Sequence, residues 1–396
     1  MICQDAPRAR CYLEVNTAAI ANNLAAAREL LKPKTRLIAV LKADAYGYGL
    51  RTVGRFLWTQ GVRHFAVACL SEAFELRDAL PEAWILCMGE SLDGALDTAI
   101  RQDIRLTVGA CDAAQRVSQA AQQTNTPAKV HFKVDTGLHR IGFTPDTAAE
   151  QIVRCTALPG IALEGLYTHL ALHNTQSDQA QQAAFETVRT GLLAKGIAIP
   201  MAHMLDSIGI TRYPQWQYDA VRVGAMLYGN TPNGYAQPER IQPVGRFCAR
   251  VTRVFMVKAG ELIGYDDDHS LMHDTRVAVI SAGYADGYPR VFSGKGEIEI
   301  HGRRAWVLGL ICMDQMMVDV TGIPDAAPGD EVVLIGRSGA AEITMEAIAD
   351  AAGSFNYEFC CGISRRVPRV YTRAGAPEHT VHYLLDAHPD YKGEST

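Results

Sequence analysis

The chain has 396 residues, which is too long for one ordinary domain and favours two. Its residues are 48% hydrophobic and 20% charged, as is typical of a globular protein that buries a substantial core. The formal charge of -5 is small and the basic residues are scattered along the chain. These properties argue against nucleic acid and anionic membranes as partners.

The sequence also lacks the usual features of an exported or membrane-bound chain. No apolar run approaches the roughly 18 residues of a membrane helix, and the first ten residues lack a signal-peptide core. The ten cysteines are scattered from Cys3 to Cys361, and no Cys-x-x-Cys pair occurs. We therefore expect buried thiols in a reducing cytoplasm, with no disulfides and no bound metal.

Eight short apolar runs in the first 230 residues predict strands separated by helices. The runs are continuous rather than alternating, as expected for parallel strands buried on both faces. They are Leu37–Leu41, Phe65–Cys69, Trp84–Met88, Arg105–Val108, Val130–Val134, Leu163–Thr168, Met201–Leu205 and Val221–Leu227. A helix capped by Asn16 or Thr17 precedes the first run. The alternation favours a TIM-like (β/α)8 barrel over residues 1–242, and a doubly wound open sheet is the competing topology.

Beyond residue 242 the pattern changes to short β-like runs joined by Gly, Asp and Pro turns. The runs are Arg250–Val257, Val277–Ser281, Ile298–His301, Ala305–Cys312 and Val332–Ile335, with one helix at Met345–Ala352. We predict a β-rich C-terminal domain over 243–376, with which the first residues of the chain could pair. A polar tail that is poorly ordered in part follows over 377–396.

Lys42 stands directly after the first apolar run, where a parallel barrel places catalytic side chains. A lysine at a strand end often extends its ammonium group into water, and this reading is the simpler one for Lys42 alone. The alternative is a Schiff-base lysine, whose amine becomes nucleophilic when its surroundings lower its pKa.

Sequence blocks along nearly the whole chain favour the second reading. They are Val40–Gly49, Lys133–Gly142, Tyr167–His169, Val221–Gly224 with Tyr228-Gly229, Gly264-Tyr265, Gly283–Pro289, Ile311–Gln315 and Arg366–Arg369. In this order, the blocks resemble those of the alanine racemases, which are two-domain enzymes that depend on pyridoxal 5'-phosphate. The resemblance implies the barrel and β-domain architecture, a homodimer, and D-alanine supply for cell-wall peptidoglycan.

The resemblance also implies a two-base mechanism on a pyridoxal-phosphate aldimine. The cofactor delocalises the carbanion left by loss of the Cα proton, and inversion needs a base on each face. Lys42 is assigned to the cofactor and to one face. Tyr265 is assigned to the other face, from the second subunit of the dimer.

A phenol with a pKa near 10 is a poor base, so its phenolate must be favoured. The family places a histidine and then an arginine behind it, at positions that match His169 and Arg222. Arg222 is also expected to hydrogen-bond the pyridine nitrogen. Because a guanidinium only donates, that nitrogen stays unprotonated, which weakens the electron sink and discourages side reactions.

Further residues are assigned to the phosphate and the substrate by matching the family motifs. The phosphate set is Tyr46, Ser207, Arg365 and the backbone N–H groups of Gly224 and Ala225. The substrate set is Arg140 and Met313, with Tyr284 and Asp314 in support. Lys133 is expected to be carbamylated, since an unmodified ammonium would repel Arg140.

Three positions depart from the family pattern. Asp206 stands where an asparagine is usual, and Arg365 stands where tyrosine is frequent in the bacterial enzymes. Gly264-Tyr265 is followed by an acidic run, which we interpret as a solvated loop. Arginine at 365 would reshape the pocket, so a racemase for serine or for a broader range of amino acids is the nearest alternative.

Other functional classes fit less well. Barrel decarboxylases and aldolases that use the same cofactor generally pair its nitrogen with an acid, which argues against them here. A non-catalytic pyridoxal-phosphate carrier would lack the β-domain and Tyr265. Nothing in the charge pattern favours a purely structural protein. Yellow colour bleached by borohydride would reveal a cofactor on Lys42.

Overall fold

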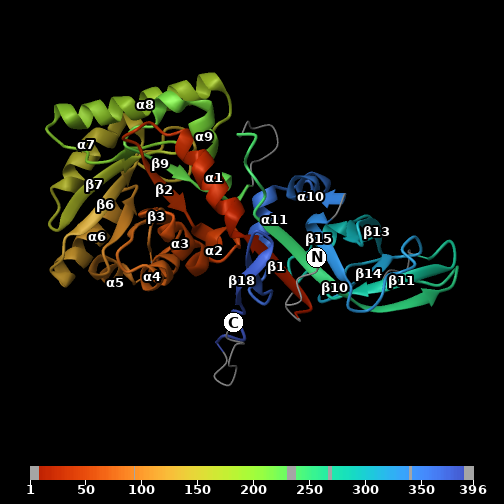
Figure 1. The fold of residues 1–396 in the computed structure, drawn as a ribbon. Helices are drawn as coiled ribbons and strands as arrows, with labels where there is room; N and C mark the ends of the chain where they lie inside the picture. Colours follow the sequence, from red (N-terminus) through yellow and green to blue (C-terminus); the bar gives the residue numbers. More distant parts are fainter. Residues whose placement is uncertain (1–8, 93, 230–237, 266–269, 339–340, 388–396) are drawn as a thin grey trace.

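The computed structural model describes residues 9–92, 94–229, 238–265, 270–338 and 341–387. Within these ranges the chain forms a closed barrel of eight strands and, beside it, a sheet of ten strands (Figure 1). Helices surround the barrel, whereas the sheet domain carries only short helices. The predicted fold class, a TIM-like barrel followed by a β-rich domain, is confirmed.

Every barrel strand is parallel to its neighbours, and β2 pairs with β9 to close the ring. This closure excludes the open doubly wound sheet. The strands are β2 (Arg36–Val40), β3 (His64–Val67), β4 (Trp84–Cys87), β5 (Ile104–Val108), β6 (Ala128–Lys133), β7 (Ile161–Tyr167), β8 (Ala202–His203) and β9 (Ala220–Val223). Most of their residues are buried, above all toward the C-terminal ends of the strands, because helices cover the outer face, as the continuous apolar runs predicted.

The helices of the barrel alternate with its strands, and α1 precedes the first of them, β2. They are α1 (Thr17–Glu29), the short α2 (Lys42–Tyr46), α3 (Leu50–Thr59), α4 (Leu70–Ala79), α5 (Leu96–Arg101), α6 (Cys111–Thr124), α7 (Pro145–Thr156), α8 (Thr175–Ala194) and α9 (Ser207–Arg212). Single 3-10 turns cover Pro214–Trp216 and Ala225–Tyr228. Asn16 caps α1, since its side chain accepts the Ala19 N–H at 3.1 Å.

The second sheet has the strand order β16-β15-β12-β13-β14-β11-β10-β1-β17-β18. Its strands are β1 (Cys11–Asn16), β10 (Gly245–Val257), β11 (Thr275–Ile280), β12 (Glu297–Ile300), β13 (Arg303–Leu308), β14 (Met316–Asp319), β15 (Glu331–Ser338), β16 (Ala341–Ile343), β17 (Arg369–Arg373) and β18 (Ala376–Val381). A 3-10 turn (Arg290–Phe292) and helices α10 (Met345–Ala352) and α11 (Asn356–Gly362) complete the domain.

Strand β1, the first strand among the described residues, belongs to this sheet although it precedes the barrel in sequence. Strand β1 pairs antiparallel with β10 and parallel with β17, and α1 leads directly from β1 into the barrel. Arg369 of β17 is fully buried, and its guanidinium donates to four backbone carbonyls, one of them that of Gly47 beside α2 at 3.0 Å. The sheet is therefore fastened to the part of the barrel that carries Lys42.

Several predicted elements differ from the observed ones. The run Val221–Leu227 is a strand only to Val223, because Gly224 is followed by a 3-10 turn. The run Ala305–Cys312 ends as a strand at Leu308. Residues Ala376–Val381, at the start of the predicted polar tail, form the edge strand β18. The domain boundaries at 242 and 376 stay predictions.

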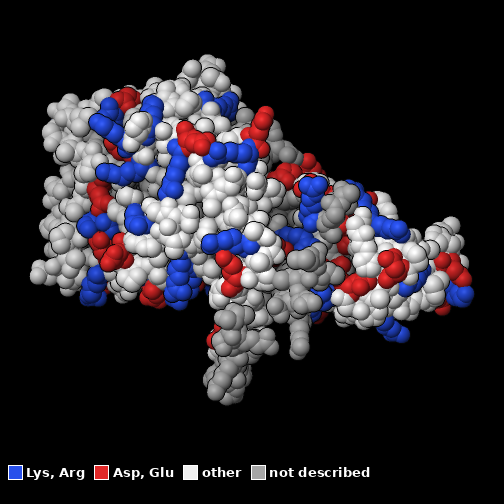
Figure 2. Space-filling view, viewed as in Figure 1, with Lys and Arg blue, Asp and Glu red and all other residues white. Residues whose placement is uncertain are grey.

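Acidic and basic side chains are interspersed on the face of the molecule seen in Figure 2, in line with the scattered charges of the sequence. Of the helices that the structure describes, none is both long enough and apolar enough to cross a membrane.

Candidate active site

A cavity of about 740 Å³ opens at the C-terminal ends of the barrel strands. Strands β2, β6, β7 and β9, the segment after β8, and helix α11 of the second domain all contribute to its lining. Nine predicted site residues line it: Lys42, Tyr46, Lys133, Arg140, His169, Ser207, Arg222, Gly224 and Ala225. The sequence motifs, which are up to 183 positions apart (42 to 225), thus meet in one place.

Lys42 follows the end of β2 and begins a turn of unusual backbone geometry. The residues Ala43, Asp44, Ala45 and Tyr46 all have φ between 53° and 57°, in the left-handed region. The Lys42 side chain is open to solvent through the cavity, although protein surrounds much of it. This partial desolvation, and next the charge of Arg140, lower its pKa and favour the nucleophilic neutral amine.

Arg222 on β9 is buried, and its two terminal nitrogens, Nη1 and Nη2, are engaged by acceptors on neighbouring segments. Its guanidinium donates to His203 Nδ1 at 2.6 Å, to His169 Nδ1 at 3.2 Å, and to the carbonyls of Thr168 at 2.8 Å and Met204 at 2.7 Å. Burial lowers the pKa of Arg222, but a guanidinium stays charged across the biological range. The cavity floor therefore holds a fixed, oriented cation.

Arg222 also determines the protonation of three histidines. Because a guanidinium only donates, His169 and His203 must accept at Nδ1 and carry their proton on Nε2. His203 Nε2 lies 2.9 Å from His131 Nδ1, so His131 accepts there and also carries its proton on Nε2. Burial, and next nearby arginines, lower the pKa of all three rings, that of His131 to about 3. All three are therefore neutral near pH 7.

Ser207 and the turn after β9 form a cradle of small donors. The Ser207 hydroxyl accepts the backbone N–H groups of Gly224 at 3.0 Å and Met226 at 3.2 Å, which leaves its own proton free to point elsewhere. A Cβ added at Gly224 would lie 2.6 Å from the Tyr46 hydroxyl. Only glycine lets Tyr46 approach this turn, and the space suits a compact anion.

Arg140 and Lys133 face the cavity from β6 and the loop that follows it. Asp135 shapes this loop, because its carboxylate accepts the N–H groups of Gly137, His139 and Arg140 at 2.7–3.1 Å. Lys133 is 4% exposed. Burial, then Arg222 and Arg140, lower its pKa to about 7, so an unmodified Lys133 is in large part a neutral amine.

Helix α11 closes one side of the cavity with Tyr357, Glu358 and Cys361. The sequence motifs did not single out these three residues. Asp206 also lines the cavity; it caps α9 by accepting the N–H groups of Ile208 and Gly209 at 3.0 and 2.8 Å. Burial raises the pKa of Asp206.

Arg365 is not among the residues that line the cavity. Its side chain is 53% exposed and extends to Asp44 at 3.6 Å and Glu75 at 3.5 Å. The predicted contact of Arg365 with a phosphate therefore stays a prediction, and the effect of Arg365 on the pocket has no support in this geometry.

Four predicted residues lie on the second domain and do not line this cavity: Tyr265, Tyr284, Met313 and Asp314. Tyr265 is 80% exposed and Met313 is 53% exposed. Tyr284 lies beside Met313, because the Tyr284 N–H donates to the Cys312 carbonyl and the Ala285 N–H donates to the Met313 carbonyl. Asp314 pairs with Arg366, which also bonds to the buried Asp286. Within one chain, Tyr265 and Lys42 are therefore not brought together.

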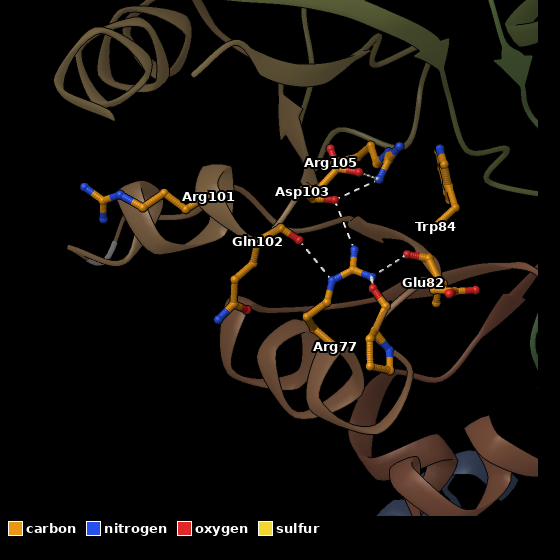
Figure 3. A pocket seen from close by; sticks show the side chains of 9 residues that line it. Arg77, Glu82, Trp84, Arg101, Gln102, Asp103 and Arg105 are labelled. Atoms are coloured by element: carbon orange, nitrogen blue, oxygen red, sulfur yellow. Dashed lines mark hydrogen bonds and ion pairs between the residues drawn. The ribbon is translucent and has the colours of Figure 1, made fainter. Parts of the chain in front are cut away.

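A second cavity, of about 420 Å³, lies at the opposite end of the barrel (Figure 3). Its guanidinium groups are occupied. Arg77 donates to the backbone carbonyls of Pro81, Ala83 and Gln102 at 2.7–2.9 Å, and Arg105 pairs with Asp103 and Glu164. These bonds join different βα units of the barrel, so this end of the barrel is structural. Across the described ranges, no group of three or more His, Cys, Asp or Glu is arranged to hold a metal ion.

Comparison with known proteins agrees with the geometry. The N-terminal domain model of alanine racemase matches residues 15–232, and the C-terminal domain model matches 244–371. The chain belongs to the alanine racemase family. An alanine racemase of Desulforamulus reducens is 38% identical, over 91% of this chain and 98% of that one.

Solved structures of alanine racemases have the same fold. That of Bacillus anthracis with bound L-Ala-P superposes with a TM-score of 0.90 at 30% identity, covering 96% of this chain and 100% of that one. That of Bartonella henselae with covalently bound pyridoxal phosphate has a TM-score of 0.82 at 26% identity, covering 92% and 100%.

Most of the residues that the sequence analysis did not single out orient other site residues. His131 and His203 support Arg222, and Asp135 positions Arg140. One signal was available, since His131 stands two positions before Lys133 in the same strand and so shares its face. The contribution of α11 required the tertiary structure, because its cysteine and tyrosine resemble ordinary core residues.

Proposed function

We propose that the protein interconverts L-alanine and D-alanine with pyridoxal 5'-phosphate held on Lys42. The observation that carries this proposal is the convergence of nine motif residues on one cavity, with a depressed pKa at Lys42. The relatives' names supply the substrate, and the D-alanine formed would serve peptidoglycan synthesis. The absence of a membrane-crossing helix among the described residues is compatible with a cytoplasmic location.

The residues present suit this cofactor. Lys42 offers an amine to an aldehyde, and Arg222 offers a donor to a ring nitrogen. The Ser207 hydroxyl, Tyr46 and the turn at Gly224 and Ala225 form a cradle of a size and polarity suited to a phosphate, kept open by the missing Cβ of Gly224. When bound, the cofactor supplies the electron sink that makes the Cα proton acidic.

Inversion of the Cα centre requires two bases. Lys42 Nζ takes or returns a proton on one face, since its lowered pKa leaves it unprotonated more often than an ordinary lysine. Tyr265 of the partner subunit serves the other face. The exposure of Tyr265 within one chain supports this arrangement, because a catalytic phenol needs surroundings that one chain does not provide.

His169 and Arg222 assist the tyrosine and the ring nitrogen respectively. With Nδ1 bonded to Arg222, His169 presents Nε2–H toward the cavity, where it donates to the Tyr265 oxygen and stabilises the phenolate. Arg222 donates to the ring nitrogen without protonating it. Arg140 binds the substrate carboxylate, and Met313 of the partner subunit offers its backbone N–H, with Tyr284 and Asp314 supporting that loop.

The first test is racemisation of L-alanine and L-serine side by side, followed by chiral separation. Fast conversion of alanine with slow conversion of serine is expected. Comparable conversion of serine would favour a broader racemase instead. Conversion of neither amino acid would contradict the proposal.

A subunit-mixing experiment tests the shared site. Lys42→Ala and Tyr265→Phe homodimers should each lose activity by at least about 10²-fold. Unfolding and reassembling an equal mixture should restore about a quarter of wild-type activity, because half of the dimers then hold one intact site. No restoration, with mixed dimers verified by mass, would place both bases in one chain and overturn the arrangement.

A further inference from the structure

The backbone that carries Lys42 is held in a conformation that it does not favour. From Ala43 to Tyr46, four successive residues with side chains have left-handed φ angles. L-residues visit this region rarely and as single residues, so a run of four persists only when surrounding contacts enforce it.

Asp44 is the member of this turn whose side chain reaches out of it. Its Oδ1 accepts the backbone N–H of Leu50 at 2.7 Å, which fixes the start of α3. Its Oδ2 accepts the hydroxyl proton of Tyr383 at 2.9 Å. Arg365 also lies 3.6 Å from Oδ1, and the Asp44 side chain is 13% exposed. Asp44 therefore joins the Lys42 turn to the C-terminal segment.

Tyr383 packs closely against residues of both domains. The ring lies under the guanidinium groups of Arg365 at 5.0 Å and Arg369 at 5.4 Å. Gly49 makes room for two tyrosine hydroxyls, since a Cβ there would lie 2.0 Å from that of Tyr371 and 3.2 Å from that of Tyr383. Burial, and next the charge of Asp44, raise the pKa of Tyr383, so the hydroxyl remains a donor at every physiological pH.

The segment around Tyr383 has its own local order. His382 N–H bonds to the Asp386 side chain at 2.8 Å, and Asp386 N–H returns to the His382 carbonyl at 2.7 Å. This turn follows β18, at the junction of the barrel and the sheet (Figure 1). The matched C-terminal family domain ends at residue 371, so the turn lies beyond it.

We infer that Tyr383 is a positioning residue for Lys42, acting through its hydrogen bond to Asp44 to hold the left-handed turn. The inference rests on the proposed function, because a fixed turn matters only if Lys42 is the working amine. It also gives Arg365 a role other than the predicted phosphate contact: with Arg369, it covers the Tyr383 ring, and it lies beside Asp44. The alternative is that Tyr383 only fastens the end of the chain.

Tyr383→Phe tests this with the least disturbance, because it keeps the ring and both arginine contacts and removes one hydroxyl. Tyr218→Phe is the matched control. Tyr218 also donates to a carboxylate, that of Glu186 at 3.0 Å, but Tyr218 and Glu186 are not among the residues lining the cavity. Hydrogen exchange over residues 42–49 is measured with and without pyridoxal 5'-phosphate, together with the rate of cofactor release.

In Tyr383→Phe, exchange over residues 42–49 should be about tenfold faster, as expected for one lost hydrogen bond to a charged acceptor. Cofactor release should accelerate similarly, and kcat should fall with KM unchanged. Tyr218→Phe should change none of these. Asp44→Asn keeps one oxygen to accept the Leu50 N–H and turns an NH2 group toward Tyr383, whose hydroxyl can accept from it, so this variant should stay closer to wild type than Tyr383→Phe.

Unchanged exchange over 42–49 in Tyr383→Phe would overturn the inference. Faster exchange confined to 376–387 would do so as well, since Tyr383 would then only fasten the chain end. The exchange measurement without cofactor is independent of catalysis. A wild-type protein that neither binds cofactor nor racemises amino acids would instead count against the proposed function.

Discussion

Lys133 allows a quantitative prediction, because its burial and charged neighbours determine its reactivity. Burial, then Arg222 and Arg140, lower its pKa from 10.5 to about 7. At pH 8 about nine in ten Lys133 side chains are then neutral, against about three in a thousand for an exposed lysine. The neutral amine, which is the form that reacts with carbon dioxide, is thus about 300-fold enriched at this position.

The same shift predicts how stability depends on pH. Between pH 7 and 10.5 the unfolded chain binds more protons than the folded one, so stability rises with pH across this window. The cost of folding around Lys133 is complete below pH 7, at up to about 5 kcal/mol, and disappears above pH 10.5. Lys133→Met should therefore be more stable than wild type at pH 6, and equally stable at pH 11, in buffer free of carbon dioxide.

Carbamylation removes the free-energy cost of burying the Lys133 ammonium in another way. The amine lone pair attacks the carbon of carbon dioxide, an N–C bond forms, and one proton is released, which leaves a negative charge beside Arg140 and Arg222. Bicarbonate should raise the thermal midpoint of wild type but not of Lys133→Met, and carbon-13 bicarbonate should give a carbamate resonance. Lys258→Met, which alters an exposed lysine, is the control. The reasoning fails if wild type at pH 8 shows neither the resonance nor the shift.

Two other substitutions separate cofactor binding from stability. Asp206→Asn keeps the cap of α9 but removes a carboxylate from the cavity, so the Kd for pyridoxal 5'-phosphate should fall about tenfold. The gain in affinity over wild type should grow as pH rises through the elevated pKa of Asp206. A Kd equal to that of wild type at all pH values, measured by fluorescence titration, would contradict this. Arg77→Ala should lower the unfolding free energy by about 3 kcal/mol without changing kcat, as it loses several bonds to backbone carbonyls. The exposed Arg101→Ala is the control in chemical denaturation, and an equal loss in both variants would refute the structural role of Arg77.

The barrel could be predicted because its strands are continuous apolar runs, and this pattern follows directly from burial on both faces. The placement of Lys42 in the site could be predicted for the same reason, since Lys42 stands at the end of such a run. The observed β8 has only two residues, and β9 stops at Val223, where the predicted run continued. Both ends lie beside Ser207 and Gly224, where the backbone leaves the strand to form the cradle.

The C-terminal segment could not be predicted in this way. Residues Ala376–Val381 form an edge strand with a single neighbour, β17, so they need no buried face and show no clear alternation. Tyr383 appeared as one aromatic residue in a polar tail. Its relation to Asp44 spans 339 positions and depends on how the sheet sits beside the barrel.

The interior of the barrel shows why the continuous apolar runs are only part of the pattern. His131 on β6 bonds to His203 on β8, and Arg105 on β5 pairs with Glu164 on β7, so these side chains cross the barrel between strands that are not neighbours. A buried series of polar side chains is stabilised where its donors meet acceptors, and each donor left unpaired has a cost in stability. In the series Arg222, His203 and His131, only Arg222 cannot accept a hydrogen bond. Each bond of the series is therefore donated in the direction from Arg222 toward His131. This series of hydrogen bonds ends at His131 Nε2, which has no hydrogen-bond partner among the described residues. Burial, and next the charges of Arg105 and Arg222, lower the pKa of His131 and keep it neutral, so Arg222 is the only charged member of this series.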